Sequence, residues 1–129
     1  MSFTSLMPHL YTADVDQAAA FYRDQLGGRQ TFRYPPEGPT QHVELRIGDV
    51  TIALSNRDLV HAEGLPAPTP GHPMELTVWC DDTDTATAAL HAAGTPVLVQ
   101  PHTHVAGHRR AYVTDPDGNW IALVSKPIA

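Results

Sequence analysis

A strand-turn-strand pattern near the C-terminus recurs, in weaker form, half a chain earlier. Residues 115–119 read Asp-Pro-Asp-Gly-Asn and lie between two alternating apolar runs. Pro at a turn's second position and a Gly able to take positive φ are typical of a tight hairpin. In the first half, Gly48-Asp49 lies between similar runs. The chain is therefore predicted to contain two copies of one unit, with a binding site in the cleft between them.

Each copy is predicted to be a β-α-β-β-β unit. In both, an aspartate after the first strand is predicted to cap an amphipathic helix, Asp14 in one and Asp81 in the other, and glycine ends the helix. The first copy has a strand over 6–12, a helix from 14 to about 26, and strands near 30–34, 41–47 and 50–55. The second has a strand over 74–80, a helix over 82–93, and strands near 96–100, 108–114 and 120–125.

These elements predict an α+β fold in one domain, residues 1–129, in which tandem βαβββ units form a curved, mostly antiparallel mixed sheet around a cavity, with helices on its outer face. The first unit covers 1–55 and the second 74–129. Between them, 56–73 contains several prolines and glycines without apolar periodicity and reads as a linker. In the second helix, the side predicted to face the sheet carries Ala86, Ala89, Leu90 and Ala93.

Strand alternation gives the predicted sheet two unlike faces. One is apolar and is expected to pack on the helices; its members are Leu6, Leu10, Val43, Leu45, Ile52, Leu54, Leu76, Val78, Val113, Ile121 and Leu123. The other mixes aromatic, charged and small residues; its members are Met7, His9, Tyr11, His42, Glu44, Arg46, Thr51, Ala53, Ser55, Glu75, Thr77, Trp79, His108, Arg110, Tyr112, Trp120 and Ala122. Such a mixture suits a ligand cavity better than a core.

Composition excludes several other classes of function. The net charge of −6, with one lysine among the 129 residues, argues against nucleic-acid binding. One cysteine, Cys80, permits neither an internal disulfide nor a multi-thiolate zinc site. No apolar run is long enough to cross a bilayer, and no secretory signal is evident, so a cytoplasmic protein without membrane contact is expected.

The paired units, the segment from Asp14 to Tyr22 and the run Arg110–Trp120 together resemble the vicinal oxygen chelate superfamily. This superfamily contains glyoxalases, extradiol dioxygenases, fosfomycin-inactivating thiol transferases, and bleomycin and mitomycin resistance proteins. The resemblance covers almost the whole chain and implies the fold. It does not fix the function, because one scaffold serves both metal enzymes and metal-free drug binders.

The resemblance also implies four metal-ligand positions, usually His or Glu, on the first and last strands of each unit. Counted from the helix caps and hairpins, these positions hold Met7, Ala53, Glu75 and Ala122. Thioether and methyl groups do not hold a hard divalent cation, so three of the four expected ligands are missing. The expectation is a protein with no metal and no cofactor.

The preferred hypothesis is a metal-free, small-molecule binding protein of the antibiotic-resistance kind, which sequesters a planar or aromatic antibiotic or metabolite. The resemblance implies a homodimer. Alanine at ligand positions opens volume, aromatic rings provide stacking surfaces, and charged groups orient the ligand. The residues expected to bind it are Met7, His9, Tyr11, Ala53, Glu75, Trp79, Arg110, Tyr112, Trp120 and Ala122.

Several alternatives remain open. The main one is a glyoxalase-like lyase or isomerase with Glu75 or His9 as general base, or with one divalent metal displaced to His9 and His42, Glu44 or Glu75. Equally, Glu75 is compatible with a purely structural role, as the ion-pair partner of Arg110 or Arg46. Two tryptophans are also compatible with core positions or a subunit interface. The remaining histidines are expected to be solvated, or in one pair to be a weak metal signal; they are His61, His72, His91, and His102 with His104.

Overall fold

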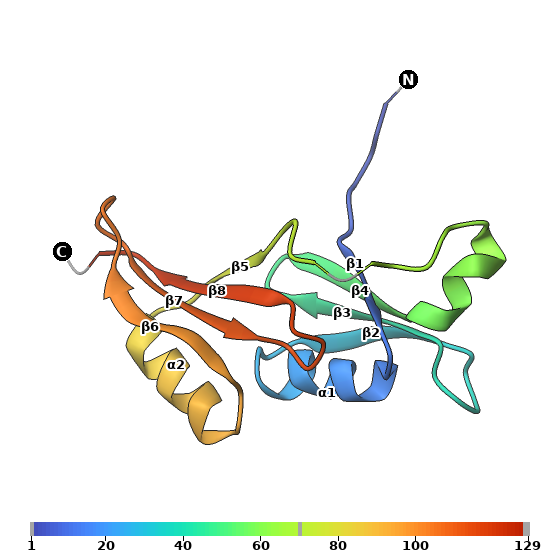
Figure 1. Ribbon diagram of the computed structural model, residues 1–129, viewed down its shortest axis with the longest axis horizontal. Helices are drawn as coiled ribbons and strands as arrows, with labels where there is room; N and C mark the ends of the chain where they lie inside the picture. The colour runs from blue at the N-terminus through green and yellow to red at the C-terminus, as the bar shows by residue number, and fades with distance from the viewer. Residues whose placement is uncertain (1, 70, 128–129) are drawn as a thin grey trace. The chain divides into compact units, whose positions relative to one another are not determined.

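The computed structural model describes residues 2–69 and 71–127, and close contacts group the chain into two compact units, Met1–Thr69 and Pro70–Ala129 (Figure 1). The first unit contains β1 (His9–Thr12), α1 (Val15–Asp24), β2 (Arg29–Tyr34), β3 (His42–Ile47) and β4 (Val50–Asn56). The second contains β5 (Leu76–Trp79), α2 (Thr83–Ala92), β6 (Val97–Thr103), β7 (Arg109–Thr114) and β8 (Trp120–Ser125). The predicted tandem βαβββ order is confirmed.

Each unit has its own four-stranded mixed sheet. The strand order is β1-β4-β3-β2 in the first and β5-β8-β7-β6 in the second. In both, the first strand pairs in parallel with the last, and the remaining neighbours are antiparallel. The helix of each unit packs on one face of its own sheet. The α+β class predicted from the sequence is therefore confirmed.

Aspartate side chains begin both helices. Asp14 Oδ1 accepts a hydrogen bond from the Gln17 amide at 3.0 Å, and Asp82 Oδ1 accepts one from the Thr85 amide at 3.2 Å. Each bond satisfies an amide that has no partner within the helix. With Asp82 as the cap, Glu75 precedes its helix by the same number of residues as Met7 precedes Asp14. The two first-strand positions are thus equivalent.

The buried side of α2 differs from the predicted alanine side. Thr83, Thr87 and Leu90 are buried, whereas Ala89 is exposed. Of the predicted side, Leu90 is buried and Ala86 is half-buried, but Ala89 and Ala93 are exposed, because the prediction treated threonine as a surface residue. The Thr83 hydroxyl lies 2.7 Å from Ser125 Oγ, and the Thr87 hydroxyl donates to the Thr83 carbonyl at 2.7 Å. Hydroxyls with partners are buried at little cost.

The hairpin between β7 and β8 has the turn that its sequence predicts. The Asp115 carboxylate is buried and accepts hydrogen bonds from the Asp117 amide at 3.0 Å and the Asn119 amide at 2.8 Å. Gly118 has a φ of 84°, which side-chain-bearing residues rarely adopt. Asp115 therefore acts as a turn former, as its sequence context indicates.

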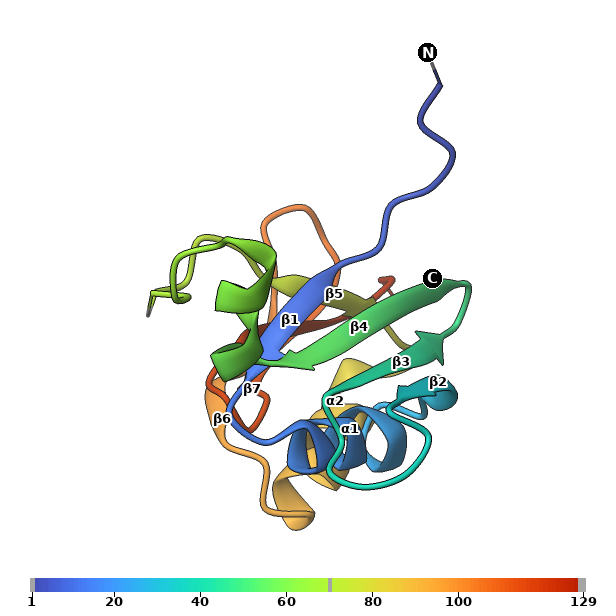
Figure 2. The same ribbon diagram turned by 90° about the vertical axis from the view of Figure 1, so that its right-hand side faces the viewer.

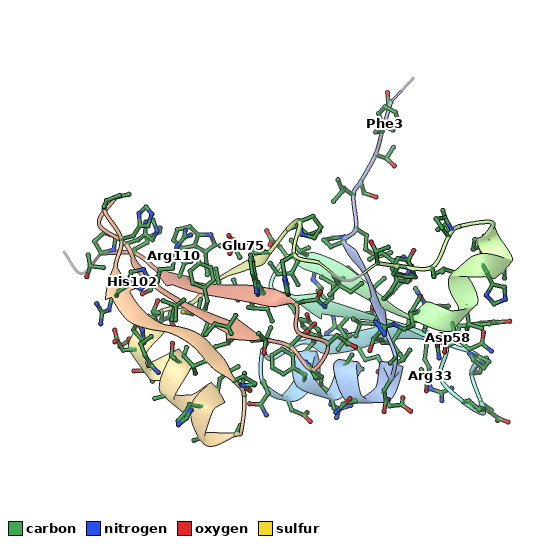
Figure 3. The ribbon with its side chains drawn as sticks, viewed as in Figure 1. Phe3, Arg33, Asp58, Glu75, His102 and Arg110 are labelled. Carbon is green, nitrogen blue, oxygen red and sulfur yellow. The ribbon has the colours of Figure 1, made fainter. Side chains whose placement is uncertain are left out.

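The first strand begins later than predicted. β1 starts at His9, and the preceding segment, residues 2–8, has no regular secondary structure. Phe3, labelled in Figure 3, lies on this extended segment and is 92% exposed, while Leu6 is 86% exposed. The prediction that Leu6 packs on the helix is wrong, because alternation alone does not show where strand pairing starts.

Residues 56–73, predicted to be an irregular linker, begin within the first unit and contain a 3-10 helix, η1 (Arg57–Glu63). Asn56 begins it by accepting a hydrogen bond from the Asp58 amide at 2.9 Å, and Gly64 ends it with a φ of 86°. Figure 2 shows η1 beside β1 and β4, on the side of the sheet away from α1. Val60 of η1 is buried. Within the described residues, no helix is long and apolar enough to cross a membrane.

Candidate functional site

In the first unit, strand register identifies the residues on the face away from α1. His9 pairs with Ala53, Tyr11 with Ser55, and His42 with Ser55 from the other side. Glu44 is opposite Ala53 on the same face. Directly paired residues in a sheet point to the same side, so these side chains gather on one surface, as the sequence predicts.

A continuous hydrogen-bond chain joins four of these side chains. Glu44 Oε2 lies 2.9 Å from His42 Nε2, and His42 Nδ1 lies 2.7 Å from Ser55 Oγ. Ser55 Oγ in turn lies 2.7 Å from His9 Nε2. We call Glu44, His42, Ser55 and His9 the first-unit chain. It links a carboxylate to a hydroxyl through an imidazole.

Hydrogen-bond chemistry fixes the direction of this chain when both imidazoles are neutral. A carboxylate only accepts, so His42 Nε2 carries a proton and His42 Nδ1 is an acceptor. The Ser55 hydroxyl therefore donates to His42, and the Ser55 oxygen accepts from the Nε2–H of His9. Every proton in the chain has a defined position. His9 Nδ1 is left as an acceptor.

The surroundings of His9 favour its neutral form. Partial burial is the main cause of a pKa below the ordinary value of 6.5, and the neighbouring His42 lowers the pKa further, while Glu44 acts in the opposite direction. The His9 ring also stacks on Tyr11, with 5.1 Å between ring centroids. Stacking holds the imidazole against the sheet and orients it toward Ser55.

A hollow of ≈ 300 Å³ opens next to this chain, at the lower end of the sizes of small-molecule sites. Its walls come from β1, β2, β3, β4 and the η1 segment, and all of them belong to the first unit. The lining residues are His9, Tyr11, Tyr34, Gln41, His42, Ser55, Asn56, Leu59, Val60, Glu63 and Leu65.

In the second unit, the face away from α2 is aromatic. Tyr112 pairs with Ala122 and Thr77 also pairs with Ala122, so these side chains share this face with Trp79 and Trp120. Trp79 is 62% exposed and Trp120 is 40% exposed. Neither tryptophan belongs to the buried core. A groove of ≈ 710 Å³ borders Trp79.

His72 covers one face of Trp120. The two rings are nearly parallel, at 2°, with 4.3 Å between centroids. His72 Nε2 also lies 3.0 Å from the Gly118 carbonyl, to which its N–H donates. The expectation that His72 is a solvated linker residue missed this contact. The Trp120 indole therefore accepts a flat heteroaromatic ring on its face.

Arg110 on β7 and His108, just before β7, each present a buried nitrogen without a hydrogen-bond partner. Arg110 Nη1 donates to the Tyr112 hydroxyl at 2.9 Å. Among the described residues, Arg110 Nε and His108 Nε2 are buried without a hydrogen-bond partner. His108 stacks on His104, with 4.6 Å between centroids, and desolvation lowers the His108 pKa, with His104 and Arg110 adding to the effect. The Arg110 Nε–H is a buried donor without an acceptor, and its free-energy cost would be relieved by a ligand oxygen.

The residues at the four expected ligand positions differ in exposure. Ala53 and Ala122 are fully buried, whereas Met7 is 40% exposed and precedes β1. Glu75, labelled in Figure 3, is exposed and precedes β5. The ion pairs of the described residues do not include one between Glu75 and Arg110. The structure thus brings His9, Tyr11 and Ala53 together in the first unit, and Trp79, Arg110, Tyr112 and Ala122 on one sheet in the second.

These positions do not fit a resident metal, because only Glu75 offers a ligand atom of the kind that hard cations prefer. In the part of the chain that the structure describes, no group of three or more His, Cys, Asp or Glu side chains is arranged to hold a metal ion. In the first-unit chain, both imidazoles direct a nitrogen to the Ser55 hydroxyl instead.

Sequence reasoning placed His42, Glu44 and Ser55 on the ligand face but gave none of them to the ligand site. The available signal was their spacing: His42 and Glu44 are two residues apart on one strand, and Ser55 is opposite His42 across a hairpin. His72 and the η1 residues were missed because they come from a segment without a clear period. Tyr34, at the end of the predicted strand 30–34, was also missed.

Comparison with known proteins agrees with this architecture. The family model of the Glyoxalase/Bleomycin resistance protein/Dioxygenase superfamily matches residues 4–123. The chain belongs to this superfamily. No curated protein matches the sequence.

Solved structures with the same fold include proteins of several kinds. TioX from Micromonospora sp. ML1 is 22% identical, with 98% of each chain covered and a TM-score of 0.73. A lactoylglutathione lyase from Agrobacterium tumefaciens is 23% identical, with 97% of this chain and 96% of that chain covered and a TM-score of 0.73. A glyoxalase-related enzyme from Fulvimarina pelagi is 23% identical, with 98% and 92% covered and a TM-score of 0.79. At these identities the likeness shows the fold alone.

Proposed function

We propose that this protein captures a planar, aromatic small molecule without a metal, and that it protects the cell from an antibiotic or toxic metabolite by reversible sequestration. The observation that carries the proposal is the parallel stack of His72 on Trp120, at 4.3 Å between centroids. A neutral imidazole and a planar heteroaromatic ligand offer a similar flat π-surface. A ligand that replaces His72 gains the indole face without a rearrangement of the sheet.

Polar groups on the same sheet supply orientation. Arg110 Nε is a permanent donor, because arginine stays protonated, and it lacks an acceptor among the described residues. A ligand carbonyl or carboxylate suits it. Trp79 and Tyr112 add stacking surface, and Ala122, which pairs with Tyr112, adds little bulk to the same face. Ala53 and Met7 have the corresponding role in the first unit, and Glu75 offers a counter-charge to a cationic group.

The proposed mechanism breaks no bond. Binding removes aromatic surface from water, and each well-stacked ring adds about 0.5–1.5 kcal/mol beyond the effect of its buried area. A homodimer that completes the pocket is part of the proposal, because the superfamily resemblance implies it.

Tryptophan fluorescence tests the proposal. Titration with bleomycin and mitomycin C, together with a panel of planar heteroaromatic antibiotics, is expected to quench emission at saturating ligand. Trp120→Ala is expected to abolish high-affinity quenching, whereas Trp79→Phe retains it. Recovery of chemically intact ligand from the complex supports sequestration. A ligand that is converted to product, or quenching that persists in Trp120→Ala, contradicts it.

A lyase or isomerase of the same superfamily is the second candidate, favoured by the acceptor at His9 Nδ1 beside a hollow. His9 is then the general base, with Glu75, exposed at the start of β5, as the other candidate. A version with one displaced divalent metal requires His9, His42 and Glu44 to turn away from their present hydrogen-bond partners, because the described residues contain no group arranged to hold a metal ion. Elemental analysis of protein purified without chelator discriminates: a stoichiometric divalent metal supports the metal enzyme and contradicts the metal-free binder.

A further inference from the structure

The first-unit chain has the order of groups that activates a serine nucleophile. A carboxylate, Glu44, holds one nitrogen of His42, and the other nitrogen of the same ring accepts the Ser55 proton. The two distances, 2.9 and 2.7 Å, are those of direct hydrogen bonds. Nucleophile, base and orienting acid are recognised by such geometry on any fold.

We propose that Ser55 is a nucleophile that hydrolyses small, uncharged esters with an aromatic or apolar group, with His42 as general base and Glu44 as its positioning residue. This activity is separate from the sequestration proposed above and does not rest on it, because every group belongs to the first unit and neither tryptophan takes part.

The position of Ser55 suits attack on a bound molecule. Ser55 is partly exposed and lines the hollow of ≈ 300 Å³. Tyr11 and Tyr34 provide aromatic walls on one side, and Leu59 and Leu65 provide apolar groups from the η1 segment. A ring and a short acyl chain fit this volume.

Charge around the hollow selects against anions. Glu44 belongs to the chain, and Glu63 lines the hollow, while no arginine or lysine is among its lining residues. An anionic substrate is repelled by both carboxylates. The carboxylic acid product ionises after cleavage, so the same repulsion favours its release.

The first chemical step makes an acyl-serine. Ser55 Oγ bonds to the carbonyl carbon while its proton passes to His42 Nδ1, and the carbonyl electron pair moves to oxygen. The Nε2–H of His9, 2.7 Å from Ser55 Oγ, is within reach of this oxyanion. Collapse of the intermediate breaks the bond to the leaving alcohol, which takes the proton from His42.

The second step repeats the sequence with water. Water gives a proton to His42 Nδ1 as its oxygen adds to the acyl carbon. Collapse then breaks the bond between carbon and Ser55 Oγ, and the serine recovers the proton from His42. The net reaction converts ester and water to acid and alcohol, and no metal or redox partner enters the balance.

The test uses the full chain, 2-naphthyl acetate as substrate and a fluorophosphonate as covalent probe. Release of 2-naphthol above the buffer rate is expected, together with one fluorophosphonate adduct that peptide mapping places on Ser55. Ser55→Ala is expected to abolish both. His42→Gln is expected to lower the rate by about 10²-fold or more, the range of general-base contributions. Thr51→Val, which removes a hydroxyl from the same face of β4 but outside the hollow, keeps the adduct.

A pH profile separates catalysis from a merely structural role. The rate is expected to fall as pH decreases, because protonated His42 cannot accept the serine proton. The other titratable groups around His42 are Glu44, His9, Tyr11, Tyr34 and Glu63. Glu44→Gln is expected to lower the rate while the Ser55 adduct still forms, only more slowly.

Ser55→Cys in a Cys80→Ala background covers the case in which Ser55→Ala fails to fold. The new thiol is expected to react with iodoacetamide at least tenfold faster when His42 is present than in the same protein with His42→Gln. Equal alkylation rates overturn the proposal. So do an adduct mapped to another residue, ester hydrolysis unchanged in a folded Ser55→Ala protein, and a wild-type protein with neither adduct nor turnover. Retained quenching of Trp120 by a planar ligand in any of these variants leaves sequestration intact.

Discussion

Each unit has its own sheet. The side chains on the helix side are similar in the two sheets, and those on the other side differ. Toward the helices, Leu54 and Leu123 hold equivalent places, each paired with the first strand of its unit, and they are 1% and 2% exposed. On the other side, Ala53 and Ala122 are also equivalent. The remaining equivalent positions there hold His9 and Thr77, Tyr11 and Trp79, Ser55 and Val124, His42 and Arg110, and Glu44 and Tyr112.

This difference shows which residues the fold constrains. The helix side of each unit needs apolar side chains of similar volume, because close packing tolerates little change. Core packing does not constrain the side chains on the opposite side, so these can be polar, charged or reactive. The first unit uses it for a hydrogen-bond chain, and the second for exposed aromatic rings and unpaired donors. Repetition therefore explains the architecture, and divergence points to function.

The largest expected effect tests the shared side. Leu54→Ala and Leu123→Ala each remove a buried side chain at equivalent places, so each is expected to lower the free energy of unfolding by about 2–5 kcal/mol. Chemical denaturation followed by circular dichroism measures it. Val50→Ala, at a position 47% exposed, is the control with an effect below about 0.5 kcal/mol. A large loss in only one of the two leucine variants breaks the equivalence.

The next prediction makes the first unit resemble the second at one position. Ser55→Val replaces the serine by the residue at the equivalent place, Val124, and leaves His42 and His9 without their shared partner. A loss of about 1–3 kcal/mol is expected from the unsatisfied polar atoms. Thr51→Val, a similar change on the same face of β4, is the matched control and is expected to be near neutral. Equal losses of unfolding free energy in the two variants indicate that the hydrogen bonds of the first-unit chain add nothing to stability.

A smaller effect is expected when His72 is removed from the face of Trp120 in the second unit. In a Trp79→Phe background, which leaves Trp120 as the only tryptophan, His72→Ala is expected to uncover the indole and increase its quenching by acrylamide. The change in stability is expected to stay below about 1.5 kcal/mol, the upper range for an aromatic pair. His61→Ala, on η1 of the first unit, leaves the quenching unchanged. Unchanged quenching in His72→Ala shows that the stack does not persist in solution.

Much of the fold follows from sequence because several local signals agree. The register of β3 with β4 is set by alternation plus the turn at Gly48, and the register of β7 with β8 by the Asp115 turn. The helix starts follow from Asp14 and Asp82. The predicted start of β1 was wrong, and on the predicted side of α2 only Leu90 is buried. Both features depend on partners distant in sequence that no local period encodes.

The site was less predictable, for a related reason. Alternation placed His9, His42, Glu44 and Ser55 on one face, but the hydrogen bonds between them depend on rotamers and on pairing across β1, β4 and β3. The contact between His72 and Trp120 had no sequence signal at all, because it joins a residue of an aperiodic segment to a strand. The role of Met7, Ala53 and Ala122 in ligand capture stays a prediction.

The smallest expected effect is the pH dependence of stability, which compares one histidine of each unit. The folded protein lowers the pKa of His9 and of His108 below 6.5, so the unfolded chain binds more protons between the folded and unfolded pKa values. The free energy of unfolding is therefore expected to be highest above about pH 7 and to fall as pH decreases through 6.5 toward the folded pKa values. Urea denaturation at a series of pH values measures the slope. His9→Gln and His108→Gln are each expected to reduce it, because glutamine does not titrate. If only His9→Gln changes the slope, the histidine is desolvated on the hydrogen-bonded face of the first unit and not in the second unit. Water then reaches His108 beside the aromatic face.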